Sequence, residues 1–157
     1  MHFRISFLFM GIVFMLFTSC ASIPKASPVP NFVGHVYERK FNNMPMSDKP
    51  SSKGSPLGTT VYVYEATSLN QLNGGAVLRQ HSFASSIQSN AIDSVISDQL
   101  GAFQFNLKPG KYSVFVKYNS NYYIPFFSGV NWVSIIEIKA NEVNKMDIVV
   151  NGSESVE

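Results

Sequence analysis

The sequence has little charge and almost no cysteine. Of its 157 residues, 14% are Asp, Glu, Lys or Arg, and the formal net charge is +2. Because positive and negative charges are nearly equal in number, the chain lacks the basic surface that binding to nucleic acid requires. The same near-neutrality gives no electrostatic attraction to acidic lipid. The single cysteine, Cys20, excludes an intrachain disulfide. With 13% aromatic residues, this composition favours an all-β domain over a helical bundle.

Residues 1–19 have the character of a targeting segment and not of a folded element. Arg4 supplies a positive N-terminal region, and an almost unbroken apolar run follows it, too short for a comfortable membrane span. The run ends in the letters LFTSC, which resemble a bacterial lipobox with Phe17 in place of the usual leucine and Cys20 at its end. The alternative is an ordinary secretory signal followed by an unrelated cysteine.

The lipobox resemblance implies that Cys20 becomes the first residue of the mature protein and carries acyl chains. Each buried methylene contributes about 0.8 kcal/mol, so three chains hold a protein on a bilayer where one is marginal. Ala21 in place of aspartate resembles a signal for the outer membrane, and the lack of an acidic cluster after it favours the periplasmic side. Residues 20–31, with three prolines, form an extended tether.

Period-two patterning is clearest between residues 102 and 118. Large apolar residues alternate with smaller or polar ones in two runs, Phe103, Phe105 and Leu107, then Tyr112, Val114, Val116 and Tyr118. Between the runs, Pro109-Gly110 predicts a type II turn with Gly110 at positive φ. Asp93 to Tyr118 therefore predicts three strands in a meander, with one apolar face that a second sheet or a helix must cover.

A second turn is predicted just before the first of these runs. Asp98 can accept a hydrogen bond from the backbone two residues on, and Gly101 can take the left-handed conformation.

These residues carry a resemblance to a family. The pattern S-D-x-x-G-x-F-x-F-x-L-x-P-G-x-Y resembles the signature of carboxypeptidase regulatory-like domains, which share the transthyretin-like (prealbumin-like) β-sandwich. It matches at Asp98, Gly101, Phe103, Phe105, Leu107, Pro109, Gly110 and Tyr112. The pair Gly34 and Val36 is similar to the opening strand of the family. The resemblance implies a Greek-key sandwich that accompanies a catalytic domain and has no peptidase activity itself.

We therefore predict an all-β chain with a single transthyretin-like Greek-key β-sandwich of about seven strands. The sandwich occupies residues 32–150, after the signal peptide and tether, and a polar tail follows at 151–157. Its first strand is expected at 32–40, a central or tyrosine-presenting strand at 59–66, and later strands at 132–139 and 145–150.

Residues 67–92 leave two alternatives open. A short amphipathic helix within 78–92 would place Phe83, Ile87 and Ala91 on one side. An extra hairpin around Gly74-Gly75 is the other possibility, and the many serines in this segment disfavour a helix.

The sequence offers no convincing metal or catalytic site. His35 and Glu38 have the H-x-x-E spacing of zinc ligands, with His81 as the third candidate, but residues three apart on a strand point to opposite faces. No Ser-His-Asp or Cys-His set can be assembled, so we predict no metal, no cofactor and no catalytic activity. Asp93-Ser94-Val95 resembles the short O-glycosylation sequon of Bacteroides-like bacteria, or it simply starts a strand.

Aromatic residues late in the chain form the candidate ligand surface. Tyr122, Tyr123 and Trp132 could stack on sugar rings or hold a peptide strand, although burial in the core is the other reading. We therefore predict a membrane-anchored, non-catalytic binding or assembly module of the bacterial envelope, whose partner is a protein, a peptide or a glycan. The alternatives are a structural subunit with protein contacts only, and a hydrolase whose site the sequence does not reveal.

Cys20→Ala is expected to release the protein from the membrane fraction, because it removes the only residue to which the lipid can attach. Membrane flotation and incorporation of labelled palmitate measure this. Ser19→Ala is the matched control, since it keeps both the cysteine and a small residue before it. Continued flotation of the Cys20→Ala chain would rule out the lipid anchor.

Overall fold

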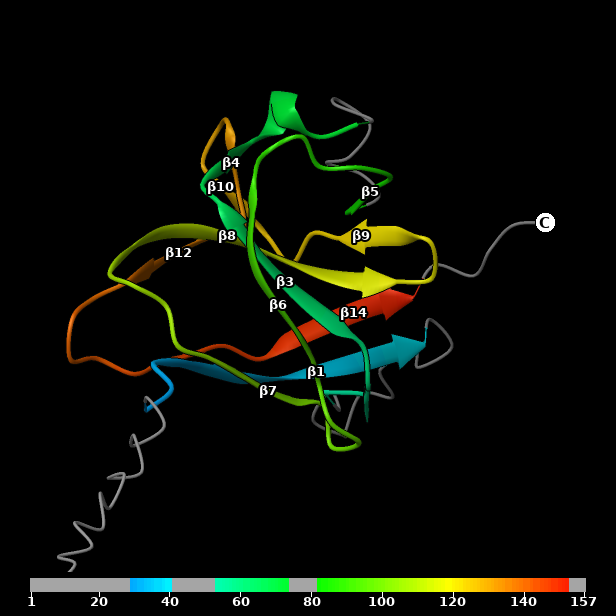
Figure 1. Cartoon of the computed structure of the whole chain (residues 1–157). Coiled ribbons are helices and arrows are strands. Elements are labelled where there is room, and N and C mark those ends of the chain that lie inside the picture. The colour runs from blue at the N-terminus through cyan, green and yellow to red at the C-terminus, as the bar shows by residue number, and fades with distance from the viewer. Residues whose placement is uncertain (1–28, 41–52, 74–81, 153–157) are drawn as a thin grey trace, which may run out of the picture.

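The computed structural model describes residues 29–40, 53–73 and 82–152, which form a β-sandwich (Figure 1). The elements are β1 (Phe32–Lys40), β2 (Ser55–Pro56), β3 (Thr60–Glu65), β4 (Thr67–Ser68), the 3-10 turn η1 (Leu69–Gln71), β5 (Phe83–Ala84), β6 (Ala91–Ile96), β7 (Ala102–Phe105), β8 (Gly110–Tyr118), β9 (Asn121–Tyr123), β10 (Phe127–Ser128), β11 (Trp132–Val133), β12 (Ile135–Ile138), β13 (Asn144–Lys145) and β14 (Ile148–Gly152). The predicted all-β sandwich is confirmed, with more and shorter strands than the seven expected. No helix in the described ranges is long and apolar enough to cross a membrane.

The first sheet is built around β1, which has neighbours on both sides. β7 and β2 run antiparallel to β1, and β13 and β14 run parallel to it along its other side. Phe32, Gly34 and Val36 point to the interior, as their alternation predicts, and all three are buried. β14 continues to Gly152, so the last strand ends two residues beyond the predicted boundary at 150.

The second sheet has the strand order β5-β9-β8-β3-β6, and β12 also pairs with β8. β3 lies between β8 and β6, which is the central position that its two apolar faces allow. The main core fills the space between the two sheets and consists of Phe32, Val36, Val61, Val63, Phe103, Phe105, Leu107, Val114, Val116, Tyr123, Ile138, Ile148 and Val150. The predicted inner faces of β7 and β8 are therefore confirmed.

A small third sheet covers the outer face of the second sheet. It has the order β10-β11-β4, is called the cap below, and lies at the top of Figure 1. The cap encloses a second cluster that consists of Tyr64, Leu72, Ala84, Phe115, Ile124 and Val133. Phe115 is completely buried although it points away from the main core, because the cap shields it from water.

The predicted meander between Asp93 and Tyr118 is wrong. β6 and β8 both pair with β3 in the second sheet, whereas β7, which lies between them in the chain, pairs with β1 in the first. The chain therefore crosses the core twice. The side chain of Asn31 holds the second crossing, because its Nδ2 donates to the carbonyl of Leu107 (2.7 Å) and its Oδ1 accepts from the amide of Leu107 (2.9 Å).

The turn at the first crossing matches its prediction. Oδ1 of Asp98 accepts hydrogen bonds from the amides of Leu100 (2.9 Å) and Ala102 (2.8 Å). Gly101 has a φ of +78°, and a Cβ there would lie 2.2 Å from the carbonyl oxygen of Val36. Only glycine satisfies both the backbone conformation and the contact with β1.

The turn at the second crossing differs from its prediction. Gly110 is not among the glycines with positive φ in the described residues; it begins β8 and pairs with Ile138 of β12. A Cβ at Gly110 would meet no atom closer than 3.4 Å. A type II reversal would bring β7 and β8 side by side, and the two strands lie in different sheets.

The segment before β6 is extended, so the helix predicted within 78–92 is wrong for its described part. β5 and β6 occupy this part, and an isolated antiparallel bridge joins Leu72 to Ile87. This pairing agrees with the alternative of an extra hairpin; Gly74-Gly75, around which that hairpin is predicted, lies outside the described residues.

The strand predicted at 132–139 is divided in two by Ser134. This residue has a φ of +48°, and both its amide (2.9 Å) and its hydroxyl (3.0 Å) donate to the carbonyl of Phe126. The chain bends there, so β11 joins the cap while β12 joins the second sheet.

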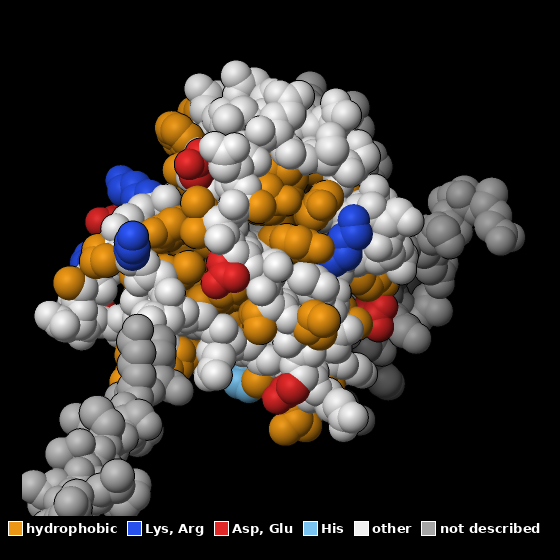
Figure 2. Space-filling model, in the orientation of Figure 1, with side chains coloured by type: hydrophobic (Ala, Val, Ile, Leu, Met, Phe, Trp, Pro, Cys, Tyr) orange, Lys and Arg blue, Asp and Glu red, His pale blue; other side chains and the backbone are white. Residues whose placement is uncertain are grey.

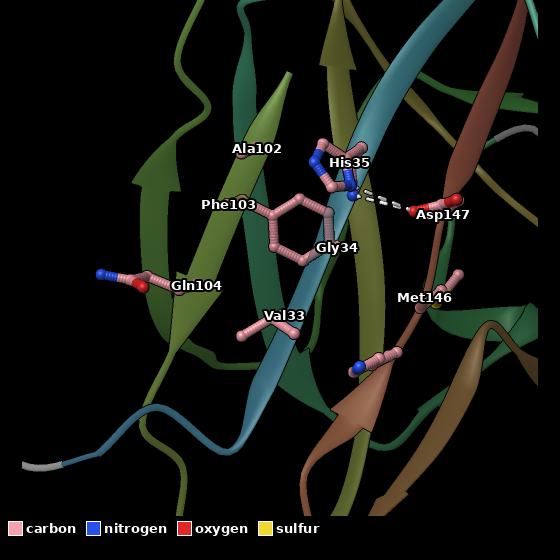
Figure 3. A pocket seen from close by; sticks show the side chains of 9 residues that line it. Val33, Gly34, His35, Ala102, Phe103, Gln104, Met146 and Asp147 are labelled. Carbon is pink, nitrogen blue, oxygen red and sulfur yellow. Dashed lines mark hydrogen bonds and ion pairs between the residues drawn. The ribbon is translucent and has the colours of Figure 1, made fainter. Parts of the chain in front are cut away.

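Gly34 marks the tightest contact in the first sheet. A Cβ on this residue would lie 1.7 Å from the carbonyl oxygen of Met146 and 2.8 Å from Cζ of Phe103. Phe103 is the cross-strand partner of Gly34, and Figure 3 shows its ring lying against the glycine backbone. The absent side chain therefore makes room for both an aromatic ring and the approach of the last segment.

Gly34→Ala is expected to lower the free energy of unfolding by about 3 kcal/mol or more, because backbone must move to admit the methyl group. Urea denaturation measures the change. Gly110→Ala is the matched control and is expected to change stability by less than about 1 kcal/mol, since its Cβ would make only ordinary contacts with the side chain of Tyr112. Equal stability of the two variants would contradict the close approach at Gly34.

Candidate functional site

The structure separates the three aromatic residues of the predicted ligand surface. Tyr122 and Tyr123 are neighbours on β9, so their side chains point to opposite faces of the second sheet. Tyr123 is 5% exposed in the main core, where its ring centroid lies 5.3 Å from that of Phe83. Its inclusion in a ligand surface is therefore wrong. Trp132 lies on the cap and is 49% exposed.

Tyr122 lies on the outer face of the second sheet, in a group of tyrosines. Its ring centroid is 5.5 Å from that of Tyr62, and Nζ of Lys117 lies 4.2 Å above it. Figure 2 shows hydrophobic side chains gathered over this face. Burial and a hydrogen bond with Tyr122 raise the pKa of Tyr64 to about 12, so its phenol stays neutral at physiological pH. This group is largely packed on itself.

Trp132 lines a hollow of about 310 Å³ that lies where β4 and the η1 turn meet the start of β11. Ser68, Leu69 and Asn70 form one wall, and Asn131 and Trp132 form the other. Trp132 is the cross-strand partner of Ser68. The hollow thus combines one large aromatic surface with a hydroxyl and two amides.

A backbone hydrogen bond joins the two walls, since the amide of Leu69 donates to the carbonyl of Asn131 (2.7 Å). Side-chain hydrogen bonds stabilise the wall that contains Leu69. Oε1 of Gln71 accepts from both the amide and the hydroxyl of Ser68, each at 2.8 Å, and so holds the η1 turn closed. Gly129, with a φ of +70°, forms the turn that leads to Trp132.

A buried serine attaches the cap to the central sheet. Ser113 of β8 is completely buried, accepts a hydrogen bond from the amide of Thr67 (2.9 Å) and donates to the carbonyl of Val133 (2.6 Å). Its hydroxyl therefore connects two strands of the cap, β4 through Thr67 and β11 through Val133. Because an unpaired buried amide or carbonyl is costly, this bridge holds the two walls at a set distance.

Part of the polar lining of the Trp132 hollow is available to a ligand. The hydroxyl of Ser68 is already engaged with the side-chain oxygens of Asn70 and Gln71. Within the part of the chain that the structure describes, no group hydrogen-bonds the indole N–H of Trp132 or the side-chain amide of Asn131. An exposed indole offers a flat apolar face, and amides both donate and accept. This set can stack on the C–H face of a ring while it binds the hydroxyls at the ring's edge.

A second hollow, of about 550 Å³, lies on the outer face of the first sheet (Figure 3). Its main polar group is Asp147, whose Oδ1 accepts from the amide of His35 (3.2 Å) and lies 3.4 Å from its Nδ1. Oδ2 accepts from Nζ of Lys53 (2.7 Å). The parallel pairing of β1 is interrupted between β13 and β14, and the carboxylate of Asp147 accepts the hydrogen bond of the His35 amide there. The oxygens of this carboxylate are therefore already hydrogen-bonded to His35 and Lys53.

The H-x-x-E spacing does not bring its two residues together. His35 is engaged with Asp147, and Glu38 accepts a hydrogen bond from the hydroxyl of Tyr118 (2.6 Å), which raises the pKa of Tyr118 to about 12. The described residues contain no group of three His, Cys, Asp or Glu side chains close enough to hold a metal ion. His81, the third candidate, lies outside the described residues.

The two predicted modification sites lie in different parts of the chain. Cys20, with its proposed lipid, lies outside the described residues. Asp93-Ser94-Val95 lies within β6, where Ser94 is exposed. Sequence reasoning missed the contribution of Asn70 and Asn131 beside Trp132, because a strand pairing 64 positions apart in the chain, between Trp132 and Ser68, brings the two walls together.

Comparison with known proteins leaves the chain unassigned. No family model matches it, and no curated protein is significantly similar to it.

Protonation of Asp147 is expected to weaken the fold at acid pH. The hydrogen bond from Lys53 holds the pKa of this carboxyl below its ordinary value of about 3.9, so its stabilising effect is complete above that pH. The effect is lost as the pH falls through the lower, folded-state pKa. Urea midpoints measured between about pH 2 and 6 should therefore fall less steeply with acid in Asp147→Asn than in the unchanged chain.

Glu137→Gln, which neutralises an exposed carboxylate on β12, is the control for this measurement. It is expected to leave the acid dependence unchanged. Parallel curves for Asp147→Asn and the unchanged chain would show that the contact with Lys53 has no effect on stability.

Proposed function

We propose that this protein is a non-catalytic binding module, attached to the outer membrane through Cys20, that takes a saccharide in the hollow beside Trp132. The observation that carries the proposal is the half-exposed indole next to amide and hydroxyl groups that are held by the η1 turn and the cap. Sugar rings present an apolar face and a polar edge, which is the complement of this set.

The position of the hollow suits attachment to a surface. Figure 1 shows the start of β1 at one end of the molecule and the cap at the other. The proposed tether, residues 20–31, leads directly into β1. A module held in this way presents the Trp132 hollow away from the bilayer, toward the space where glycans are found.

Two alternatives predict different results. A structural subunit would bind a protein in fixed stoichiometry and would not need an open hollow at Trp132. A hydrolase would need a nucleophile or an activated water beside a base. The imidazole of His35 is a candidate base in the second hollow, but among the described residues no serine, threonine or cysteine lines that hollow.

Trp132→Ala is expected to weaken saccharide binding at least about 30-fold, or about 2 kcal/mol, as is usual for an aromatic anchor. A glycan array with the full-length chain would identify the saccharide, and calorimetry with that saccharide would give the ratio. Since the side chain is half exposed, the thermal unfolding midpoint should change little.

Phe126→Ala is the control, because Phe126 is an exposed aromatic residue that does not line the hollow. It is expected to keep full affinity. Binding that survives Trp132→Ala, or an array with no bound glycan, would overturn the saccharide proposal. A stoichiometric protein recovered from cross-linked membranes would then favour the structural subunit.

A further inference from the structure

Strand β6 forms a free edge of the second sheet. It pairs with β3 on one side, and no described strand pairs with its other side. Two of its large apolar residues are exposed to solvent, Ile92 at 47% and Ile96 at 75%. In the orientation of Figure 1, β6 runs across the visible face, and Figure 2 shows hydrophobic side chains on that face. A long apolar edge is a template for another strand.

The backbone of β6 has hydrogen-bonding groups directed away from β3. The amide of Ser97 donates to the carbonyl of Thr59 (2.8 Å), which sets the alternation of the ladder. Asp93 and Val95 therefore bond toward β3, and the amides and carbonyls of Ser94 and Ile96 point outward. This alternation holds from Asp93 onward, because the register with β3 shifts between Val63 and Tyr64 and leaves Ile92 as a bulge. Within the described chain, the outward amide of Ser94 is met only by the Oδ1 of its neighbour Asp93 (2.8 Å).

We propose that β6 pairs antiparallel with β6 of a second copy of this chain, about a two-fold axis at Ser94. In this register Ser94 faces Ser94 of the second copy, and at both ends of the ladder Ile96 of one copy lies against the bulge at Ile92 of the other. Asp93 falls opposite Val95. The outward amide of Ser94 then exchanges its bond with Asp93 for the carbonyl of the other strand.

The register follows from the residues of β6 themselves. A shift by one residue would oppose outward to inward backbone groups and is excluded. The other two-fold register with comparable overlap has its axis at Asp93, and it would place two carboxylates directly opposite each other, which is destabilising. Only the axis at Ser94 covers both exposed isoleucines and keeps the charges apart. The strand is thus complementary to itself, which favours a second copy over an unrelated partner.

The other free edges lack this combination. β14 and β7 border the first sheet on opposite sides of β1, with five and four residues, and neither strand has an exposed large apolar residue. β5 has only two residues. The proposed dimer does not depend on the saccharide proposal, because β6 contributes nothing to the Trp132 hollow.

Ser94→Cys tests the dimer in the full-length chain, with Cys20 replaced by serine so that the introduced thiol is the only one. The axis places the two introduced thiols opposite each other, so mild oxidation is expected to give a covalent dimer on a non-reducing gel. Leu100→Cys is the control: Leu100 is 70% exposed but lies beyond the end of β6, and it should give little dimer.

A second substitution separates strand pairing from random collision. Ile96→Lys, added to the Ser94→Cys chain, is expected to abolish the covalent dimer, because it places a charge opposite Ile92 of the second copy. Leu100→Lys in the same background is expected to leave the dimer intact. Circular dichroism confirms that each variant is folded, as the exposure of these side chains predicts. Failure of Ser94→Cys to cross-link, or cross-linking equal to that of Leu100→Cys, would overturn the proposal.

Discussion

The middle of strand β8, residues 113–116, is buried on both faces, and every layer of the molecule is packed against it. Val114 and Val116 close the main core on one side, while Ser113 and Phe115 support the cap on the other. A strand in this position has no solvent-facing side, so its residues alternate between two interiors and not between core and water. The cap exists because Phe115 would otherwise leave a large apolar ring exposed on the outer face.

This double burial determines where binding groups can lie. The hydroxyl of Ser113 both accepts a hydrogen bond from the cap and donates one to it. The second sheet therefore fixes the position of the two walls of the Trp132 hollow. Trp132 is left half exposed on a rigid support, which lowers the entropic cost of binding a ring. At the other side of the sheet, β6 completes the packing of β3 and leaves its own outer edge unpaired. The proposed saccharide site and the proposed dimer edge are thus separate consequences of one layered arrangement.

Local features were predictable to the extent that their causes are local. Asp98 and Gly101 form the expected turn because an aspartate oxygen and a glycine φ act within four residues. The same local reasoning predicted a positive φ at Gly110 and was wrong, since the conformation of Gly110 depends on whether β7 and β8 lie in one sheet or in two. Tyr122 and Tyr123 could be assigned to opposite faces from their adjacency. Which of the two is buried follows only from the pairing of β9 with β8.

The sequence by itself determined that the chain is all-β, where most strands lie, and which side of each strand is apolar, because a two-residue period is written in neighbouring residues. It also contains the lipobox-like segment that ends at Cys20. Tertiary structure alone decided that β7 leaves its neighbours to pair with β1, that Gly34 makes room for Phe103, and that Ser68 and Trp132 share a hollow. These are contacts between residues far apart in the chain, and their choice depends on how the apolar faces of all the strands are buried at once.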